Sequence, residues 1–140
     1  MTFSKNLSAY ENAGTLLFRI ILAAVFTAHA QLKFGTWAMH ATEQFPAAML
    51  YIVRALSILE PLAAVSLILG LYTRLTTACI ALLMSGVIFM KINVWGLHFI
   101  EQAGTGWELD IVVFGGALVL LFGGSGAYSI ENRIKNKLSA

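Results

Sequence analysis

Apolar residues dominate four stretches of the chain, and short polar segments separate these stretches. They cover residues 14–33, 47–70, 75–92 and 107–122. A helix that crosses the roughly 30 Å hydrocarbon core of a bilayer needs about 20 mostly apolar residues. The pattern therefore predicts an all-α integral membrane protein, a four-transmembrane-helix bundle that forms a single domain over residues 1–140.

Polar residues interrupt the second stretch at positions that would lie inside the membrane. Arg54, Ser57 and Glu60 recur every three residues, so they form a slanting polar ribbon along one side of a helix. A charge at the centre of a membrane-spanning helix costs at least about 2.5–3.5 kcal/mol. Pro61 follows directly and leaves the carbonyl of Ser57 without its helical partner. We expect other parts of the chain to cover this ribbon.

Further ionisable residues gather toward one end of the predicted bundle. Arg19, His29 and Lys33 fall within an arc of roughly 80° on the first helix, at about 100° per residue. The depth of each residue in the membrane follows from its distance to the midpoint of its span, at about 1.5 Å per residue. A second group of ionisable residues lies in the outer half of the bundle or near the outer ends of the helices: His29, Lys33, Arg54, Lys91, Glu108 and Asp110. We therefore predict an outer-facing pocket to which three or four helices contribute ionisable groups.

The candidate site residues divide into two roles. Glu60 and Glu108 are the candidate catalytic carboxylates, because buried acids can relay protons. The candidate substrate-binding residues are Arg54, His29, Lys33 and Arg19. Structural interpretations stay open beside these roles. Arg19 and Glu60 can form an ion pair that locks two helices, Lys33 and Lys91 can extend to the membrane interface, and Glu108 and Asp110 can cap a helix.

Composition supports the membrane assignment and excludes several classes of site. The chain is 59% hydrophobic and 11% charged, whereas soluble domains have about 25% charged residues. A net charge of +2 without basic blocks does not indicate nucleic-acid binding. Cys79 is the single cysteine, which excludes an intramolecular disulfide, a CxxC redox pair and a cysteine zinc cluster. No metal site is predicted, because the three histidines match no ligand spacing.

The distribution of cations predicts the orientation in the membrane. Four spans place both termini on one side, and that side carries most of the cations: Lys5, Arg74, Arg133, Lys135 and Lys137. The opposite side has Lys33 and Lys91 near the ends of the spans. Because cytoplasmic loops carry an excess of lysine and arginine, we expect both termini to be cytoplasmic. Residues 128–140 are expected to form a polar tail.

A set of short motifs, in this order and spacing, resembles the DoxX family of small four-span membrane proteins. The motifs are Arg19, His29, Lys33-Phe34-Gly35, Glu60, the run LILGLYTR over Leu67–Arg74, Gly106-Trp107-Glu108, and the turn GGSGAYSIE over Gly123–Glu131. One departure is Pro61 with Ala63 and Ala64, where members of the family often have glycines after the glutamate.

The resemblance implies a bacterial-type inner membrane protein linked to quinone chemistry, because the family is named from a thiosulfate:quinone oxidoreductase subunit. The chain has no intrinsic electron carrier, so the expected cofactor is a quinone, and the expected partners are the bilayer and an oxidoreductase that supplies electrons. A homo-oligomer is compatible with the sequence. Two alternatives stay open: a non-catalytic membrane anchor or assembly module for soluble partners, and a protein that binds or transports a small anion.

Overall fold

The protein is all-helical in the computed structural model, which describes residues 2–43, 45–102, 104 and 106–139, with side chains described from residue 8 onward. The side chain of Lys5 therefore lies outside the described part. Five α-helices and one 3₁₀ helix follow one another along the chain: α1 (Thr2–Lys33), η1 (Phe34–Ala38), α2 (Ala47–Leu69), α3 (Thr73–Asn93), α4 (Glu108–Gly123) and α5 (Ile130–Leu138).

Three of these helices are long and apolar enough to cross a membrane. Among the described residues these are α1, α2 and α3, so the protein is a membrane protein. The fourth predicted span, α4, has 16 residues, fewer than the roughly 20 that a full crossing needs. Its apolar sequence resembles that of the three long helices, but the four-span count stays a prediction.

Two segments differ from the sequence expectation at the ends of the chain. Helix α1 begins at Thr2, well before the predicted start at residue 14, because no proline or glycine interrupts residues 2–13. The expected polar tail contains helix α5, whose N-cap Ser129 accepts a hydrogen bond from the backbone N–H of Asn132 at 3.1 Å. Such a side-chain cap satisfies one of the free donors at a helix start.

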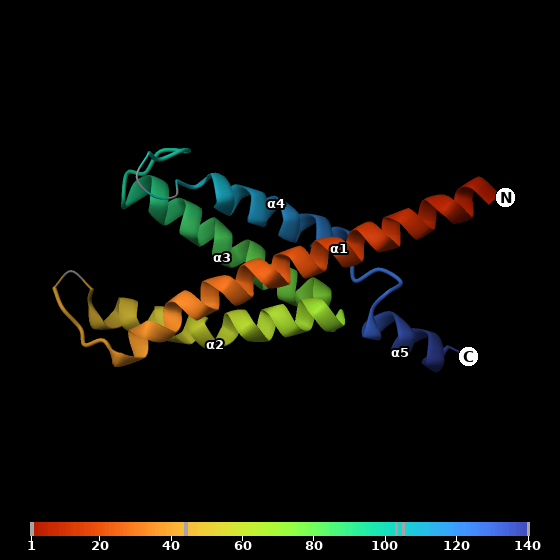
Figure 1. Ribbon diagram of the computed structural model, residues 1–140, viewed down its shortest axis with the longest axis horizontal. Coiled ribbons are helices and arrows are strands. Elements are labelled where there is room, and N and C mark those ends of the chain that lie inside the picture. Colours follow the sequence, from red (N-terminus) through yellow and green to blue (C-terminus); the bar gives the residue numbers. More distant parts are fainter. Residues whose placement is uncertain (1, 44, 103, 105, 140) are drawn as a thin grey trace.

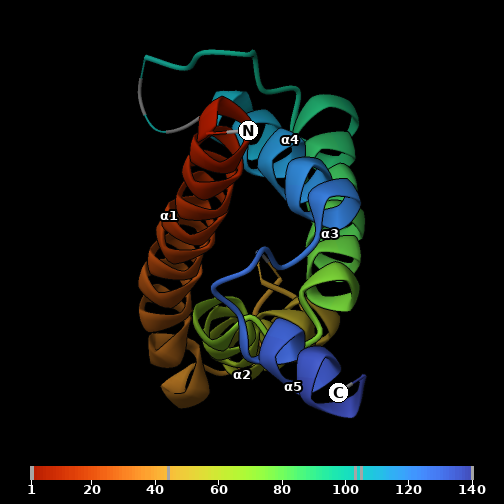
Figure 2. The ribbon, with the colours of Figure 1, turned by 90° about the vertical axis from the view of Figure 1, so that its right-hand side faces the viewer.

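The helices pack as two antiparallel pairs. Helix α1 lies along α2, and α3 lies along α4, with smaller contacts between α1 and α4 and between α2 and α3 (Figure 1, Figure 2). Both termini lie at the end where α2 turns into α3 (Figure 1), as a bundle of four spans requires. All four helices contribute to one apolar core, whose buried members are Leu22, Ala23, Phe26, Ala64, Leu67, Ile80, Ala81, Val113, Ala117 and Leu120.

Arg19 closes the end of the bundle that carries the termini, and its side chain is 1% exposed. Its guanidinium donates hydrogen bonds to four backbone carbonyls, those of Leu67 (2.7 Å), Ile68 (2.9 Å), Ser125 (2.7 Å) and Tyr128 (3.1 Å). The first two are carbonyls of the last turn of α2, which a helix leaves unsatisfied. The predicted Arg19–Glu60 ion pair is therefore wrong, because backbone carbonyls occupy the guanidinium.

Gly70 allows this closure. It ends α2 in the left-handed conformation, with φ of 65°, which side chains other than glycine adopt at a cost. A Cβ atom at this position would lie 2.7 Å from Nη2 of Arg19 and 2.5 Å from Cβ of Ser129. The glycine in the LILGLYTR run therefore serves both the turn and the approach of Arg19.

Two neighbouring glycines of α4 provide a matched test of the packing between α1 and α4. A Cβ atom at Gly116 would clash with the ring of Phe18, whereas one at Gly115 would meet nothing within 4 Å. We expect Gly116→Ala to lower the free energy of unfolding by about 1–3 kcal/mol through overpacking. Gly115→Ala should raise it by about 0.5–1 kcal/mol, because alanine favours the helix.

Unfolding in detergent, followed by circular dichroism, compares the two variants. Equal effects of the two substitutions would show that α1 and α4 do not pack closely at Phe18.

Candidate functional site

The polar ribbon of α2 is covered by the segment that follows α1. At one end, Arg54 donates to the carbonyls of Thr36 (3.1 Å) and Met39 (2.8 Å). In the middle, the indole Nε1 of Trp37 donates to Oγ of the buried Ser57 at 2.9 Å. At the other end, Glu60 pairs with the last residue of α1, as described below. The expectation that the chain covers this ribbon is confirmed.

A cavity of about 230 Å³ opens between the two helix pairs, and α1, α2, α3 and α4 all line it. Its polar lining consists of His29, Lys33, Glu60, Lys91 and Asp110. The remainder is apolar: Val25, Phe26, Leu56, Leu83, Met84, Val87, Leu109 and Val113. On each helix the lining residues recur at spacings of three or four, so each helix turns one stripe of side chains toward the cavity. A space of this size suits a small ligand or the head of a larger one.

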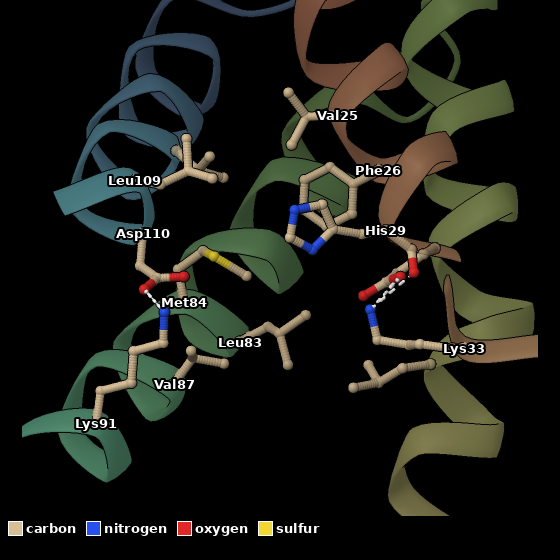
Figure 3. A pocket seen from close by; sticks show the side chains of 13 residues that line it. Val25, Phe26, His29, Lys33, Leu83, Met84, Val87, Lys91, Leu109 and Asp110 are labelled. Atoms are coloured by element: carbon tan, nitrogen blue, oxygen red, sulfur yellow. Dashed lines mark hydrogen bonds and ion pairs between the residues drawn. The ribbon is translucent and has the colours of Figure 1, made fainter. Parts of the chain in front are cut away.

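Two lysine–carboxylate pairs occupy opposite walls of this cavity (Figure 3). Nζ of Lys33 lies 2.8 Å from Oε2 of Glu60, which joins α1 to α2. Nζ of Lys91 lies 2.6 Å from Oδ2 of Asp110, which joins α3 to α4. Both pairs are largely buried, since no member's side chain is more than 19% exposed. Two cations and two carboxylates leave the cavity balanced in charge rather than cationic.

His29 lies between the two pairs, with its ring directed into the cavity (Figure 3). It precedes Lys33 by one turn of α1, and Nζ of Lys33 also donates to the His29 carbonyl at 3.2 Å. Its ring nitrogens have no hydrogen-bond partner among the described residues. An imidazole with one donor and one acceptor is thus left free to bind a ligand inside the cavity.

Three predicted site residues lie outside this cavity. Arg19 lies at the opposite end of α1, bonded to carbonyls. Arg54 lines a separate hollow beside His40. Its guanidinium is held there by hydrogen bonds to the carbonyls of Thr36, in η1, and Met39. The ring centroid of Trp37 lies 5.7 Å from its Cζ. Glu108 begins α4 with a buried, unpartnered Oε2. The expectation that Arg54 and Glu108 share the outer-facing pocket is therefore wrong, because neither lines this cavity.

Lys91 and Asp110 were expected among the ionisable groups of the pocket, but the sequence analysis gave them no catalytic or binding role. A signal for Asp110 was present in the spacing of α4, because Asp110, Val113, Ala117 and Leu120 recur at three and four residues. The last three of these are buried, so Asp110 belongs to the inward stripe and Glu108 does not. Lys91 occupies the facing end of α3, and its Nζ also donates to the carbonyl of Gly106 at 2.8 Å.

The loop between α3 and α4 holds a further histidine and carboxylate away from the cavity. Oε1 of Glu101 accepts a hydrogen bond from the backbone N–H of His98 at 2.6 Å and lies 3.1 Å from its Nδ1. The backbone hydrogen bond is the main cause that holds the pKa of the Glu101 carboxyl below its usual range. Both residues are useful as surface controls for His29 and Glu60.

Among the described residues, no three histidine, cysteine or acidic side chains are placed to hold a metal ion. Comparison with known proteins gives one family. The DoxX family model matches residues 14–92, which include α2, most of α1 and nearly all of α3. The motifs at Gly106–Glu108 and Gly123–Glu131 lie beyond the matched residues. No curated protein matches the chain, and no solved structure matches it.

Proposed function

This chain belongs to the DoxX family, and from that premise we propose that it is the membrane subunit of a quinone-linked oxidoreductase, with the quinone head in the cavity between the helix pairs. The observation that carries the proposal is the arrangement of His29 between two buried lysine–carboxylate pairs. A quinone presents carbonyl oxygens on opposite sides of its ring, and donors on opposite walls of the cavity match that geometry.

The chemistry of quinone reduction fits the groups that line the cavity. Reduction adds two electrons and two protons to the quinone and produces a quinol. Lys33, Lys91 and His29 can donate hydrogen bonds to the carbonyl oxygens, and Glu60 and Asp110 can pass protons to them. The electrons come from a partner oxidoreductase, because the chain has neither a CxxC pair nor a haem-attachment motif.

The charge balance of the cavity favours quinone over a small anion. An anion site needs an excess of positive charge, whereas each cavity lysine is already paired with a carboxylate within 2.8 Å. A neutral quinone requires hydrogen-bond donors rather than net charge. The anchor function stays an alternative, and the experiment below separates it.

We further propose that α4 completes a fourth crossing and that both termini lie in the cytoplasm of a bacterial-type inner membrane. Support comes from the pairing of Lys33 and Lys91 inside the bundle, which removes them as free flanking charges. The cations on the other side are Lys5, Arg74, Arg133, Lys135 and Lys137, at the end of the bundle that carries the termini. That asymmetry agrees with the positive-inside rule.

The test is quinone binding to the gently purified protein. We expect quinone to be retained, and His29→Ala to weaken the affinity for a short-chain quinone about tenfold, the effect of losing one hydrogen bond to the ligand. His98→Ala, in the loop between α3 and α4, should bind as the unmodified protein does. Equilibrium titration of both variants checks this.

Equal affinity of the His29→Ala variant and the unmodified protein would contradict the assignment of the head to this cavity. A protein that copurifies with an oxidoreductase but retains and binds no quinone would favour the anchor function instead.

A further inference from the structure

A second, larger hollow adjoins the polar cavity on the side where α2 and α3 separate. It has a volume of about 400 Å³, and it shares four lining residues with the cavity. These are Phe26, Leu56, Glu60 and Leu83. The two hollows therefore adjoin, and Glu60 lies where a polar space and an apolar space meet. This second hollow is called the α2–α3 groove below.

The α2–α3 groove is almost wholly apolar. Apart from Glu60 and Thr76, its lining consists of apolar side chains and Cys79: Phe26, Leu56, Leu59, Leu62, Ala63, Leu75, Ile80 and Leu83. The hydroxyl of Thr76 is already hydrogen-bonded to that of Ser66 at 2.6 Å, and Glu60 is paired with Lys33. The groove thus offers no free polar group to a hydrated ion, but it can hold a hydrocarbon chain by dispersion contacts.

The α2–α3 groove also faces the lipid. Helices α2 and α3 are both long and apolar enough to span the membrane, and they diverge from the tight turn after Gly70 (Figure 1). The rim of the groove is exposed on both helices, with Leu62 at 61% and Leu75 at 64%. A molecule dissolved in the bilayer can therefore enter between the two helices without crossing water.

We infer that the ligand is an isoprenoid-tailed quinone that enters laterally from the bilayer, with its tail in the α2–α3 groove and its head in the polar cavity. This inference rests on the proposed quinone function and specifies the substrate class and route of that site. The shared lining of the two adjoining hollows, with Glu60 in both, carries it, because an amphipathic molecule needs a polar and an apolar space side by side. A water-soluble, tail-less substrate would leave the groove without a role.

The test blocks the groove while leaving the polar cavity unchanged. Cys79→Trp places a large ring in the groove from α3, and Leu62→Trp does so from α2. Leu82→Trp is the matched control, because Leu82 is 76% exposed on the same helix as Cys79 but does not line the groove. Each variant is titrated in nanodiscs with a long-tailed quinone and with a tail-less quinone that has the same head.

We expect both groove variants to weaken the binding of the long-tailed quinone at least about tenfold relative to the control, while the tail-less quinone stays within about twofold. Two blocking variants on different helices keep the test valid if one of them does not fold. Equal weakening of the two quinones, or no weakening of either, would place the tail elsewhere and overturn this inference alone.

Failure of the unmodified protein to bind either quinone would overturn the proposed function and this inference with it. A phospholipid that remains bound in the groove, detected by native mass spectrometry and displaced by neither quinone, would assign the groove to a structural lipid and overturn the inference.

Discussion

Replacement of Arg19 by methionine is expected to lower the free energy of unfolding by about 3–5 kcal/mol, because each buried acceptor that loses its donor costs about 1–3 kcal/mol. The substitution leaves the carbonyls of Leu67, Ile68, Ser125 and Tyr128 without the donor that they now share. Arg19→Lys should lie between methionine and the native residue, because an ammonium cannot reach all four carbonyls as a planar guanidinium does.

The measurement is the midpoint of unfolding in detergent, with Arg74→Met as the control. Arg74 is an exposed arginine at the same end of the bundle, and its one hydrogen bond, to the carbonyl of Phe122, is long at 3.5 Å. Its loss should change the free energy of unfolding by no more than about 0.5 kcal/mol. Similar losses in the two variants would show that the Arg19 contacts do not hold the closing turn.

The largest effect on activity is expected for Glu60→Gln. An amide cannot pass a proton to the quinone, so turnover of the complex with its partner oxidoreductase should fall about 10²-fold or more. The same change leaves the Lys33 ammonium largely buried without its carboxylate, which is expected to cost about 3–5 kcal/mol of stability. Turnover must therefore be normalised to the amount of folded protein.

The double variant Lys33→Met/Glu60→Gln separates the two effects. It removes the unpaired charge, so stability should recover in large part, whereas turnover should stay low because the proton-transferring carboxylate and the Lys33 donor are both absent. Glu101→Gln, a change in the loop between α3 and α4, controls for the loss of a carboxylate as such. Recovery of turnover in the double variant would show that Glu60 serves structure alone.

Much of the fold followed from the distribution of apolar residues, and the site followed in part from helical spacing. The ribbon of Arg54, Ser57 and Glu60 was visible at intervals of three residues, and the need to cover it was predictable because a polar surface in lipid is costly. His29 and Lys33 were correctly expected to share one face of α1, since they lie one helical turn apart.

The partners of the charged residues were harder to predict. Arg19 and Arg54 both donate hydrogen bonds to backbone carbonyls. Because every residue has a backbone carbonyl, the sequence does not indicate which residues will accept these hydrogen bonds. Glu60 instead pairs with Lys33, a choice set by where α1 ends relative to α2. Such a pair forms only if the two helices lie at the right depth relative to each other. A shift of one helix by one turn would give the charged residues different partners.

The contacts of Arg19 also have a consequence for biogenesis. Translation delivers α1 to the membrane long before Ser125 and Tyr128 leave the ribosome, so the guanidinium enters the bilayer while two of its four acceptors do not yet exist. The turn that contains Ser125 and Tyr128 therefore supplies the last two hydrogen-bond acceptors of Arg19 on α1. Chains that terminate before residue 125 retain a partly solvated charge within the lipid, and we expect membrane proteases to degrade these chains selectively.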